Sequence, residues 1–326
     1  MTMIPGIDPA GFRPCLPLRN PHLQTILASS RLRVSSKMSV LENAEEIVVP
    51  TPHGTRLLSL HTRHPEPKGL VILLHGWEGS SASAYMIDAA AFYRQLGFSV
   101  CRLNLRDHGE SHHLNEGLFH GALIEETFEA VDFLAGLSGS RPVYLIGFSL
   151  GGNFALRIAR RYSILGKRGL DGVFAVSPPL DPYKSTVALD HGYWFYREYF
   201  LRKWKRSLVK KQNLFPDKYD FGEMLKARTC IELTKNIMPY FRDFPTYRDY
   251  FALYTLRDDF FRDYKIPVKI FISGDDPIIP RDDYDAIAEH ENFRVFRLNF
   301  GGHCGFIDFF PHRCWYHRAI AGFIDP

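Results

Sequence analysis

Apolar residues in this chain gather in short continuous runs that alternate with longer segments of helical spacing. Residues 70–74 are apolar at every position and end in His75-Gly76, and residues 143–146 form a second run of this kind. Such runs are typical of strands buried on both faces, as in a parallel sheet covered by helices. We predict eight strands, at residues 45–49, 57–60, 70–74, 98–103, 143–146, 172–176, 268–272 and 293–298.

Helical patterns lie between these strands. A sequence in which strands and helices alternate indicates βαβ units, an α/β fold class and a mainly parallel sheet flanked by helices. The predicted helices cover residues 22–27, 84–96, 118–137, 153–162, 282–289 and 315–323.

Two segments depart from this alternation and define the predicted domains. Residues 1–44 contain prolines at positions 5, 9, 14, 17 and 21, which favours an irregular arm packed on the core. Residues 181–265 show no buried strand, only aromatic and basic helical segments. We expect a helical lid there, over the edge of the sheet where open α/β folds bind ligands. The core is then residues 45–180 and 266–326.

Composition narrows the classes of function. Of 326 residues, 45% are apolar and 23% charged, and a net charge of +4 is too small to indicate nucleic acid as a partner. The five cysteines are scattered without a CxxC pair, which argues against a disulfide framework and a zinc site. The N-terminus lacks signal-peptide features, and the apolar runs are too short to span a bilayer. We expect a cytoplasmic protein that needs no metal.

The segment around Ser149 has the pattern of a catalytic nucleophile. Gly147-Phe148-Ser149-Leu150-Gly151 directly follows the strand at 143–146 and directly precedes a helix. A nucleophile elbow requires this setting, with Gly147 and Gly151 leaving room for a sharp turn. The alternative is an ordinary strand-to-helix turn in which the glycines serve only the backbone.

A nucleophilic serine needs a base and a group that orients the base. His303 lies in a Gly-rich loop after the strand at 293–298, where it can reach Ser149. Asp275 and Asp276 both follow the strand at 268–272. We prefer Asp276, which precedes Pro280 as in a Gly-x-x-Asp-x-x-x-Pro pattern with Ser273 in the first place, and Asp275 remains the alternative.

The oxyanion of such a reaction needs two preorganised donors. The backbone N–H of Leu150 follows the nucleophile, and the N–H of Trp77 lies in the loop after the strand at 70–74. Loss of one donor typically costs about 3–4 kcal/mol of transition-state stabilisation. The loop at 104–111 is predicted to brace the site, with His108 as a structural residue rather than the base.

Together these motifs resemble the α/β-hydrolase superfamily. Phe12-Arg13-Pro14 and the segment 18–27, LRNPHLQTIL, are similar to the N-terminal signature of the YheT-like branch, which includes the animal abhydrolase-domain phospholipases and esterases. The resemblance implies the α/β-hydrolase fold and the hydrolysis of short- to medium-chain acyl esters, without a cofactor. Residues 211–247 do not follow the family pattern, so the natural substrate stays open.

The segment 193–211 of the predicted lid is basic and carries Tyr196, Phe200, Trp204 and Leu208 at intervals of four. We expect this helix to cover the substrate pocket with its apolar face, and the alternative is a peripheral contact with an anionic membrane. The two are compatible. Sedimentation with anionic liposomes tests the membrane contact, and no binding at low salt would exclude it.

Three functions are compatible with this sequence. The first is a serine carboxylic ester hydrolase that forms an acyl-enzyme, acting on small-molecule acyl esters or, as a lipase or phospholipase, at a membrane surface. The second is an acyltransferase with the same three catalytic residues, and the third is a binding protein that keeps the fold without catalysis. The sequence does not determine the oligomeric state.

Overall fold

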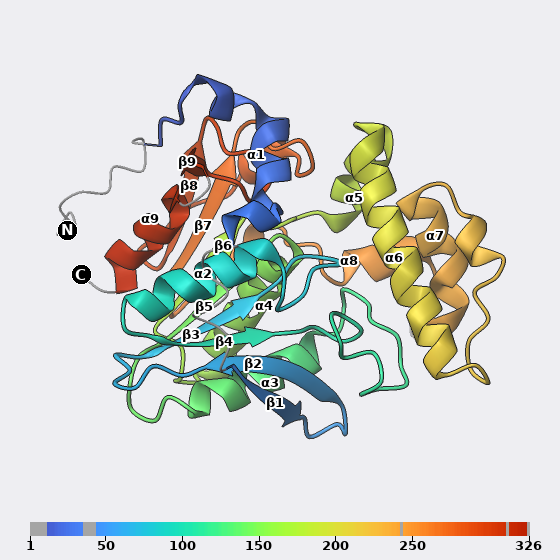
Figure 1. Ribbon diagram of the computed structural model, residues 1–326, viewed down its shortest axis with the longest axis horizontal. Helices are drawn as coiled ribbons and strands as arrows, with labels where there is room; N and C mark the ends of the chain where they lie inside the picture. Colours follow the sequence, from blue (N-terminus) through green and yellow to red (C-terminus); the bar gives the residue numbers. More distant parts are fainter. Residues whose placement is uncertain (1–11, 35–43, 242–243, 311–312, 325–326) are drawn as a thin grey trace.

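The computed structural model describes residues 12–34, 44–241, 244–310 and 313–324. Within them, eight strands form one sheet in the order β1-β2-β4-β3-β5-β6-β7-β8 (Figure 1). β2 pairs antiparallel with β1 and β4, and all other neighbours are parallel, so the predicted eight-stranded, mainly parallel sheet is confirmed. The strands are β1 (Glu45–Pro50), β2 (Arg56–Thr62), β3 (Leu70–Leu74), β4 (Ser99–Leu103), β5 (Val143–Phe148), β6 (Gly172–Val176), β7 (Val268–Ser273) and β8 (Phe293–Leu298).

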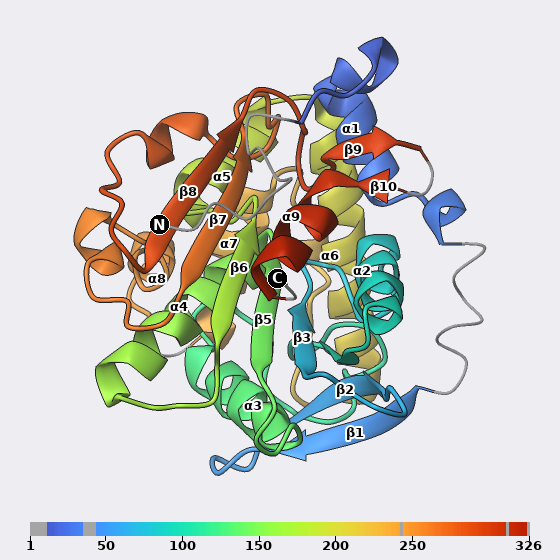
Figure 2. The same cartoon turned by 90° about the vertical axis from the view of Figure 1, so that its left-hand side faces the viewer.

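Helices cover both faces of the sheet, as the fully apolar strands require (Figure 2). Along β3, Leu70, Ile72 and Leu74 belong to the core cluster under α3 and α4, while Val71 and Leu73 belong to the cluster under α2 and α9. All five side chains are buried. The helices of this core are α2 (Ala84–Gln95), α3 (Ile124–Gly136), α4 (Leu150–Leu165) and α9 (Trp315–Ile324).

One predicted helix is wrong. Residues 282–289 contain only a short 3-10 turn at Arg281–Tyr284. A continuing α-helix would use the carbonyl of Tyr284 for the N–H of residue 288. That carbonyl instead accepts from the Arg297 side chain, at 2.8 Å, and from the N–H of Ile287, at 3.4 Å, as in a tighter turn. The Tyr284 hydroxyl donates to the carbonyl of Pro178. Tertiary contacts therefore end the turn early.

The predicted helix at 118–137 begins later than expected, at Ile124. The backbone N–H of Phe119 donates to Asp107 at 2.9 Å, and the N–H of Gly121 donates to the Tyr250 hydroxyl at 3.0 Å. These partners from other segments hold residues 118–123 as a loop, although their apolar spacing is helical. The small hairpin of β9 (Ile307–Phe309) and β10 (Arg313–Cys314) was not predicted.

The arm and the segment between β6 and β7 are helical. The arm contains α1 (Pro21–Ala28), which confirms the helix predicted there. Figure 1 shows α5, α6 and α7 beyond the end of the sheet to which β3 and β4 point. No helix in the described part of the chain is long and apolar enough to cross a membrane. The helices after β6 are α5 (Pro182–His191), α6 (Trp194–Leu214), α7 (Cys230–Ile237) and α8 (Tyr247–Ala252).

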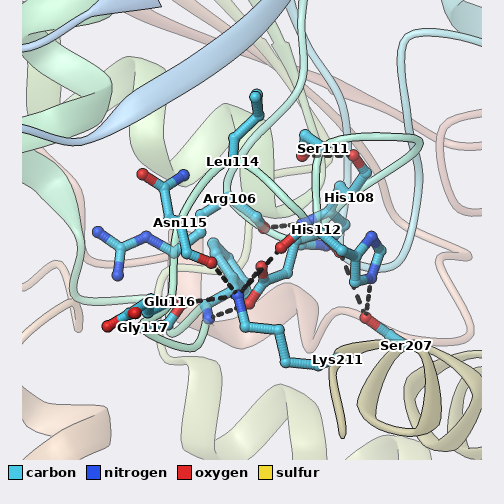
Figure 3. A network of polar contacts seen from close by, with 12 residues as sticks. Arg106, His108, Ser111, His112, Leu114, Asn115, Glu116, Gly117, Ser207 and Lys211 are labelled. Atoms are coloured by element: carbon cyan, nitrogen blue, oxygen red, sulfur yellow. Dashed lines mark hydrogen bonds and ion pairs between the residues drawn. The ribbon is translucent and has the colours of Figure 1, made fainter. Parts of the chain in front are cut away.

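The end of α6 is fixed to the core by a buried lysine. The Lys211 side chain is fully buried, and its ammonium donates to Asp107 at 2.7 Å (Figure 3). It also donates to the carbonyl oxygens of His112, Asn115 and Gly117, at 2.6–3.3 Å. One side chain of α6 thus shares its three N–H donors among four acceptors of the loop after β4.

Replacing Lys211 is expected to destabilise the fold. Lys211→Met leaves the buried Asp107 carboxylate without its partner, and removal of one member of a buried pair typically costs about 3–5 kcal/mol. Urea denaturation measures the loss as a lower free energy of unfolding. Lys210→Met is the matched control, because Lys210 pairs with the exposed Glu110, and it should change stability by about 0.5 kcal/mol or less. Equal effects of the two substitutions would contradict this account of the anchor.

Candidate active site

Ser149 lies in a sharp turn between β5 and α4. Its backbone has a φ of 51°, in the left-handed region, and α4 begins at the next residue. A Cβ atom on Gly147 would meet the carbonyl oxygen of Gly151 at 2.2 Å, and one on Gly151 would meet that of Leu74 at 2.4 Å. Only glycine fits at these two positions, so the residues flanking Ser149 serve the geometry that a nucleophile elbow needs.

The structure brings Ser149, His303 and Asp276 into one chain of hydrogen bonds. His303 Nε2 lies 2.9 Å from Ser149 Oγ, and His303 Nδ1 lies 2.9 Å from Asp276 Oδ2. The other oxygen of Asp276 accepts the N–H groups of Ile278 and Ile279, at 2.9 and 3.0 Å. The turn after β7 thus holds the carboxylate toward the imidazole.

Asp275 has a different partner. Its carboxylate accepts from the Ser273 hydroxyl and, at 2.9 Å, from the backbone N–H of Gly302. Asp275 therefore ties the loop that carries His303 to the end of β7 and does not contact the imidazole. Of the two neighbouring acids, Asp276 is the one that faces His303.

The electrostatics of His303 are dominated by its neighbours. Burial alone would lower the pKa of the imidazole, but the Asp276 carboxylate, together with Cys304, holds this pKa well above its usual value. A carboxylate at hydrogen-bond distance favours the protonated imidazole, so the ring is a strong base toward the Ser149 hydroxyl.

This shift predicts the pH dependence of activity. Below its pKa, His303 is protonated and cannot accept a proton from Ser149. We expect kcat/KM for a neutral ester to rise with pH along a limb whose midpoint lies above 6.5, the ordinary value for histidine. A rate profile measured with one ester at saturating and limiting concentrations tests this, and a limb centred below 6.5 would contradict it.

The loop after β3 has one backbone donor to spare. Of the six residues from Gly76 to Ser81, five donate their backbone N–H to protein acceptors. The N–H of Trp77 has no acceptor among the residues that the structure describes. The five pairs are Gly76 to the Tyr85 hydroxyl, Glu78 to His108, Gly79 to the Gly76 carbonyl, Ser80 to Ser83 and Ser81 to Asn104. A Cβ on Gly76 would lie 3.1 Å from that of Ser149, so this loop packs directly on the nucleophile. Trp77 thus offers a donor beside Ser149, and the N–H of Leu150, at the start of α4, offers a second.

His108 braces this loop and is not paired with Ser149. Its Nε2 accepts the N–H of Glu78 at 3.1 Å, and its Nδ1 lies 2.7 Å from the carbonyl of Arg106. The ring packs 4.8 Å from that of His75, whose Nε2 accepts the N–H of Leu105 at 3.1 Å. Burial lowers the pKa of His75 to about 4, so this imidazole is neutral and serves as an acceptor.

The arm supports the His303 loop, which sequence reasoning missed. The backbone N–H of His303 donates to Thr25 Oγ1 at 2.9 Å. The Gln24 amide accepts from the N–H of Ile307 at 2.8 Å and donates to its carbonyl at 2.9 Å. The LRNPHLQTIL motif was the available signal, since it places Gln24 and Thr25 on one buried face of α1.

Thr25 gives this support a measurable consequence. Thr25→Ala leaves the buried N–H of His303 without an acceptor, which typically costs about 1–3 kcal/mol. We expect kcat to fall by roughly tenfold as the imidazole is held less firmly, while KM changes little. Thr25→Ser keeps the hydroxyl and should restore kcat. Steady-state kinetics of the two variants test this, and similar losses in both would show that the methyl group, not the hydroxyl, matters.

Two cavities meet at Ser149. The smaller, of about 110 Å³, is bounded by buried and half-buried residues, most of them aromatic or aliphatic. The larger, of about 1110 Å³, runs between the arm, the start of α2 and α6, and reaches exposed residues of the arm. Both cavities also include Trp77, Phe200 and His303 in their walls.

The apolar stripe of α6 faces these cavities. Tyr196 and Leu208 are buried, and Phe200 and Trp204 contact Trp77. The Phe200 ring stacks on the indole at 5.5 Å, and the Trp204 ring meets its edge at 5.2 Å. This packing favours a helix that covers the pocket. Peripheral contact of α6 with a membrane stays a prediction.

A second cluster of ligating side chains lies under α2 and α9. In the described ranges, this cluster consists of Asp88, Cys314 and His317. Each offers one potential metal-ligand atom, and the three atoms lie within 4.8 Å of one another. Arg33 reaches into this cluster, where it pairs with Asp88 and donates to the Cys314 sulfur at 2.6 Å. A guanidinium is the counter-ion of this carboxylate, so the cluster reads as a buried ion pair and we assign no metal to it.

Comparisons with known proteins indicate the family of the chain. The family model for the alpha/beta hydrolase family matches residues 71–314. The chain is 23% identical over 261 residues to mouse (Mus musculus) phospholipase ABHD3, covering 78% of this chain and 63% of that protein. It is 22% identical over 279 residues to monoacylglycerol lipase of Saccharomyces cerevisiae, covering 79% and 59%. It thus spans less than two thirds of these curated relatives.

The fold also matches solved structures. An esterase of Pyrococcus furiosus, Pf2001, superposes with a TM-score of 0.58 at 17% identity, covering 88% of this chain and 93% of the esterase. At that identity the likeness concerns the fold. The YheT-like branch indicated by the arm motif remains a prediction.

Proposed function

The chain belongs to the alpha/beta hydrolase family, and we propose that it is a serine hydrolase that cleaves carboxylic esters through an acyl-enzyme. The observation that carries the proposal is the chain of hydrogen bonds from Ser149 through His303 to Asp276, in a strained turn where two cavities meet. The similar proteins described above, a phospholipase, a lipase and an esterase, support ester chemistry.

In the proposed reaction His303 Nε2 takes the proton of the Ser149 hydroxyl as the oxygen attacks the ester carbonyl. Asp276 holds the Nδ1–H tautomer and stabilises the imidazolium that forms. The imidazolium then returns its proton to the leaving alcohol, and the acyl group stays on Ser149. A water molecule activated by the same imidazole releases the acid.

The carbonyl oxygen becomes negative in each tetrahedral intermediate. We propose that the N–H groups of Trp77 and Leu150 donate to it, because the first is left without a protein acceptor by its loop and the second opens α4. Phe200 and Trp204 of α6 press on the Trp77 indole, so α6 also fixes the position of this donor.

The two cavities suggest how an ester divides. We assign the acyl group, which stays on Ser149, to the small cavity, whose walls are buried or half-buried residues. The leaving alcohol is assigned to the large cavity, whose walls include exposed residues of the arm. Aromatic and aliphatic walls such as Phe119, Phe251 and Ile279 favour an apolar acyl group. The size of the small cavity favours short chains.

A series of p-nitrophenyl esters tests the proposal. We expect turnover that depends on Ser149, with kcat/KM highest for short acyl chains such as butyryl and declining toward palmitoyl. Hydrolysis that does not depend on Ser149 would contradict the mechanism, and a preference for palmitoyl would contradict the assignment of the cavities. Adding an alcohol to the reaction and analysing the products separates hydrolysis from acyl transfer, the alternative use of the same residues.

A further inference from the structure

The walls of the large cavity are mostly apolar, but they include two cationic side chains. Arg31 and Lys203 both line it, and no aspartate or glutamate is among the described residues that do. Arg31 belongs to the arm and Lys203 to α6, so two segments that are distant in sequence bring a cation to the same space. A concave site lined by one sign of charge concentrates ligands of the opposite sign.

Lys203 differs from the other lysines of α6. Lys205 donates to the carbonyl of Ala227 at 2.6 Å, Lys210 pairs with Glu110 and Lys211 with Asp107. Within the described ranges, the contacts of the Lys203 ammonium are with Tyr199, a 3.4 Å hydrogen bond to its hydroxyl and a cation–π contact 5.1 Å from the ring centroid, and no carboxylate lies within ion-pair distance. The helix thus uses its other lysines for internal contacts and directs this one into the cavity.

Glu78, in the loop after β3, is not an effective counter-ion for Lys203. Burial raises the pKa of Glu78 to about 8, although Lys203 acts to lower it. At neutral pH the Glu78 carboxyl is mostly protonated, so Lys203 keeps its positive charge uncompensated from this side. Burial lowers the pKa of His75, the hydrogen bond to the Gly76 carbonyl acts against this, and the positive charge of Lys203 adds to the lowering.

Hydroxyl groups complete the lining. Ser29, Ser30, Ser80 and Ser83 line the same cavity as the two cations. Serine hydroxyls combined with arginine and lysine are the donors that proteins use for phosphate and carboxylate groups. An apolar ester would gain little from these groups and would leave two cations facing a non-polar ligand.

We propose that Arg31 and Lys203 form an anion-binding subsite for the alcohol part of the substrate, which therefore carries a phosphate or carboxylate group. This inference rests on the proposed function, because it assigns the alcohol to the large cavity. The substrate class is then an ester with an apolar acyl group at Ser149 and an anionic group on the alcohol side.

Binding to a variant that cannot turn over tests the subsite without relying on catalysis. The full chain with Ser149→Ala is titrated by calorimetry with three butyryl esters, of glycerol, of glycerol 3-phosphate and of glycerate. We expect the phosphate ester, the carboxylate ester or both to bind at least about tenfold more tightly than the neutral glycerol ester, as charge-assisted hydrogen bonds typically give. The anionic ester that binds more tightly shows whether the subsite prefers phosphate or carboxylate. Equal affinity for all three esters would overturn the subsite.

Lid and arm substitutions assign the effect to residues. In the Ser149→Ala background, Lys203→Met and Arg31→Met should each reduce the preference for the anionic ester by about tenfold. Lys210→Met is the matched control from the same helix and should keep the preference. A preference that survives both Lys203→Met and Arg31→Met would contradict the assignment.

The proposed function is judged separately. p-Nitrophenyl butyrate is a neutral ester without an anionic group. Its Ser149-dependent turnover therefore does not depend on the subsite. If that turnover occurs while the three butyryl esters bind with equal affinity, the proposed subsite is wrong and the proposed hydrolase activity stands. If the anionic ester binds selectively while no ester is turned over, the subsite stands and the hydrolase proposal is wrong.

Discussion

Ser149→Ala is expected to lower kcat for ester hydrolysis by about a millionfold, the loss typical of removing the nucleophile from an enzyme of this kind. Without Oγ no acyl-enzyme forms, and the residual rate reflects only the donors of Trp77 and Leu150 and the binding of the ester. The hydroxyl accepts no hydrogen bond from the backbone of α4, so its removal should leave the fold intact. Steady-state rates with p-nitrophenyl butyrate and a thermal unfolding curve measure both quantities.

The matched control is Ser138→Ala. Its hydroxyl donates to the carbonyl of Arg141 in a turn after α3, remote from the site along the fold. It should keep wild-type kcat. A Ser149→Ala protein that is folded and retains more than about a thousandth of the activity would point to a different nucleophile.

The second large effect separates two neighbouring carboxylates. Asp276→Asn should lower kcat by about ten-thousandfold, because an amide facing His303 Nδ1 favours the wrong tautomer and cannot stabilise the imidazolium. It should also lower the pKa of His303, since the Asp276 carboxylate is the largest of the interactions that raise it. The acidic limb of the rate profile is therefore expected to move to lower pH.

Asp275→Asn is the internal control for this experiment. The Asp275 oxygen that accepts the N–H of Gly302 has a counterpart in the asparagine amide oxygen, so the His303 loop should stay in place. We expect kcat within about tenfold of the wild type, with the pH limb unmoved. If Asp275→Asn were the more damaging change, the orienting role would belong to Asp275.

The sequence predicted the central part of the fold because the signals there are local. Each buried strand is a continuous apolar run, and the Gly147-x-Ser149-x-Gly151 turn follows one of them directly. The elbow geometry depends on contacts within a few residues, such as those of Gly147 with Gly151. Patterns of this range can be found without knowing the tertiary structure.

The errors occurred where distant residues decide the local structure. Residues 118–123 have helical spacing, but Asp107 and Tyr250 hold them as a loop. Residues 282–289 lose their helix to Arg297 and to the partner of Tyr284. In both places side chains from other elements bind the segment and hold it in a conformation other than the helix.

The sequence alone could not decide between Asp275 and Asp276 for a related reason. The two acids are adjacent, and which of them faces His303 depends on the turn that Ile278 and Ile279 close on Asp276. The role of Thr25 was harder still to predict, because its partner His303 is 278 positions away in the chain. Such contacts appear only when the arm is folded onto the core.

The basic helix shows how the structure changes the meaning of a composition signal. Its many lysines suggested that the helix contacts an anionic membrane. Lys205, Lys210 and Lys211, however, all bind groups of the protein itself. Of its lysines, Lys203 lines the cavity beside Ser149, while Arg206 of the same helix is exposed to solvent. Part of the positive charge of this segment therefore anchors the helix and, as proposed, another part recognises the alcohol part of the substrate.

Labelling with a fluorophosphonate, followed by peptide mass spectrometry, tests the central claim most directly. The probe reacts covalently with a serine that is activated by a neighbouring base, so it reports on Ser149 and His303 without a known substrate. We predict one label per chain, located on Ser149, and no label on the Ser149→Ala protein. An unlabelled wild-type protein, or a label on another residue, would contradict the assignment of Ser149 as the nucleophile.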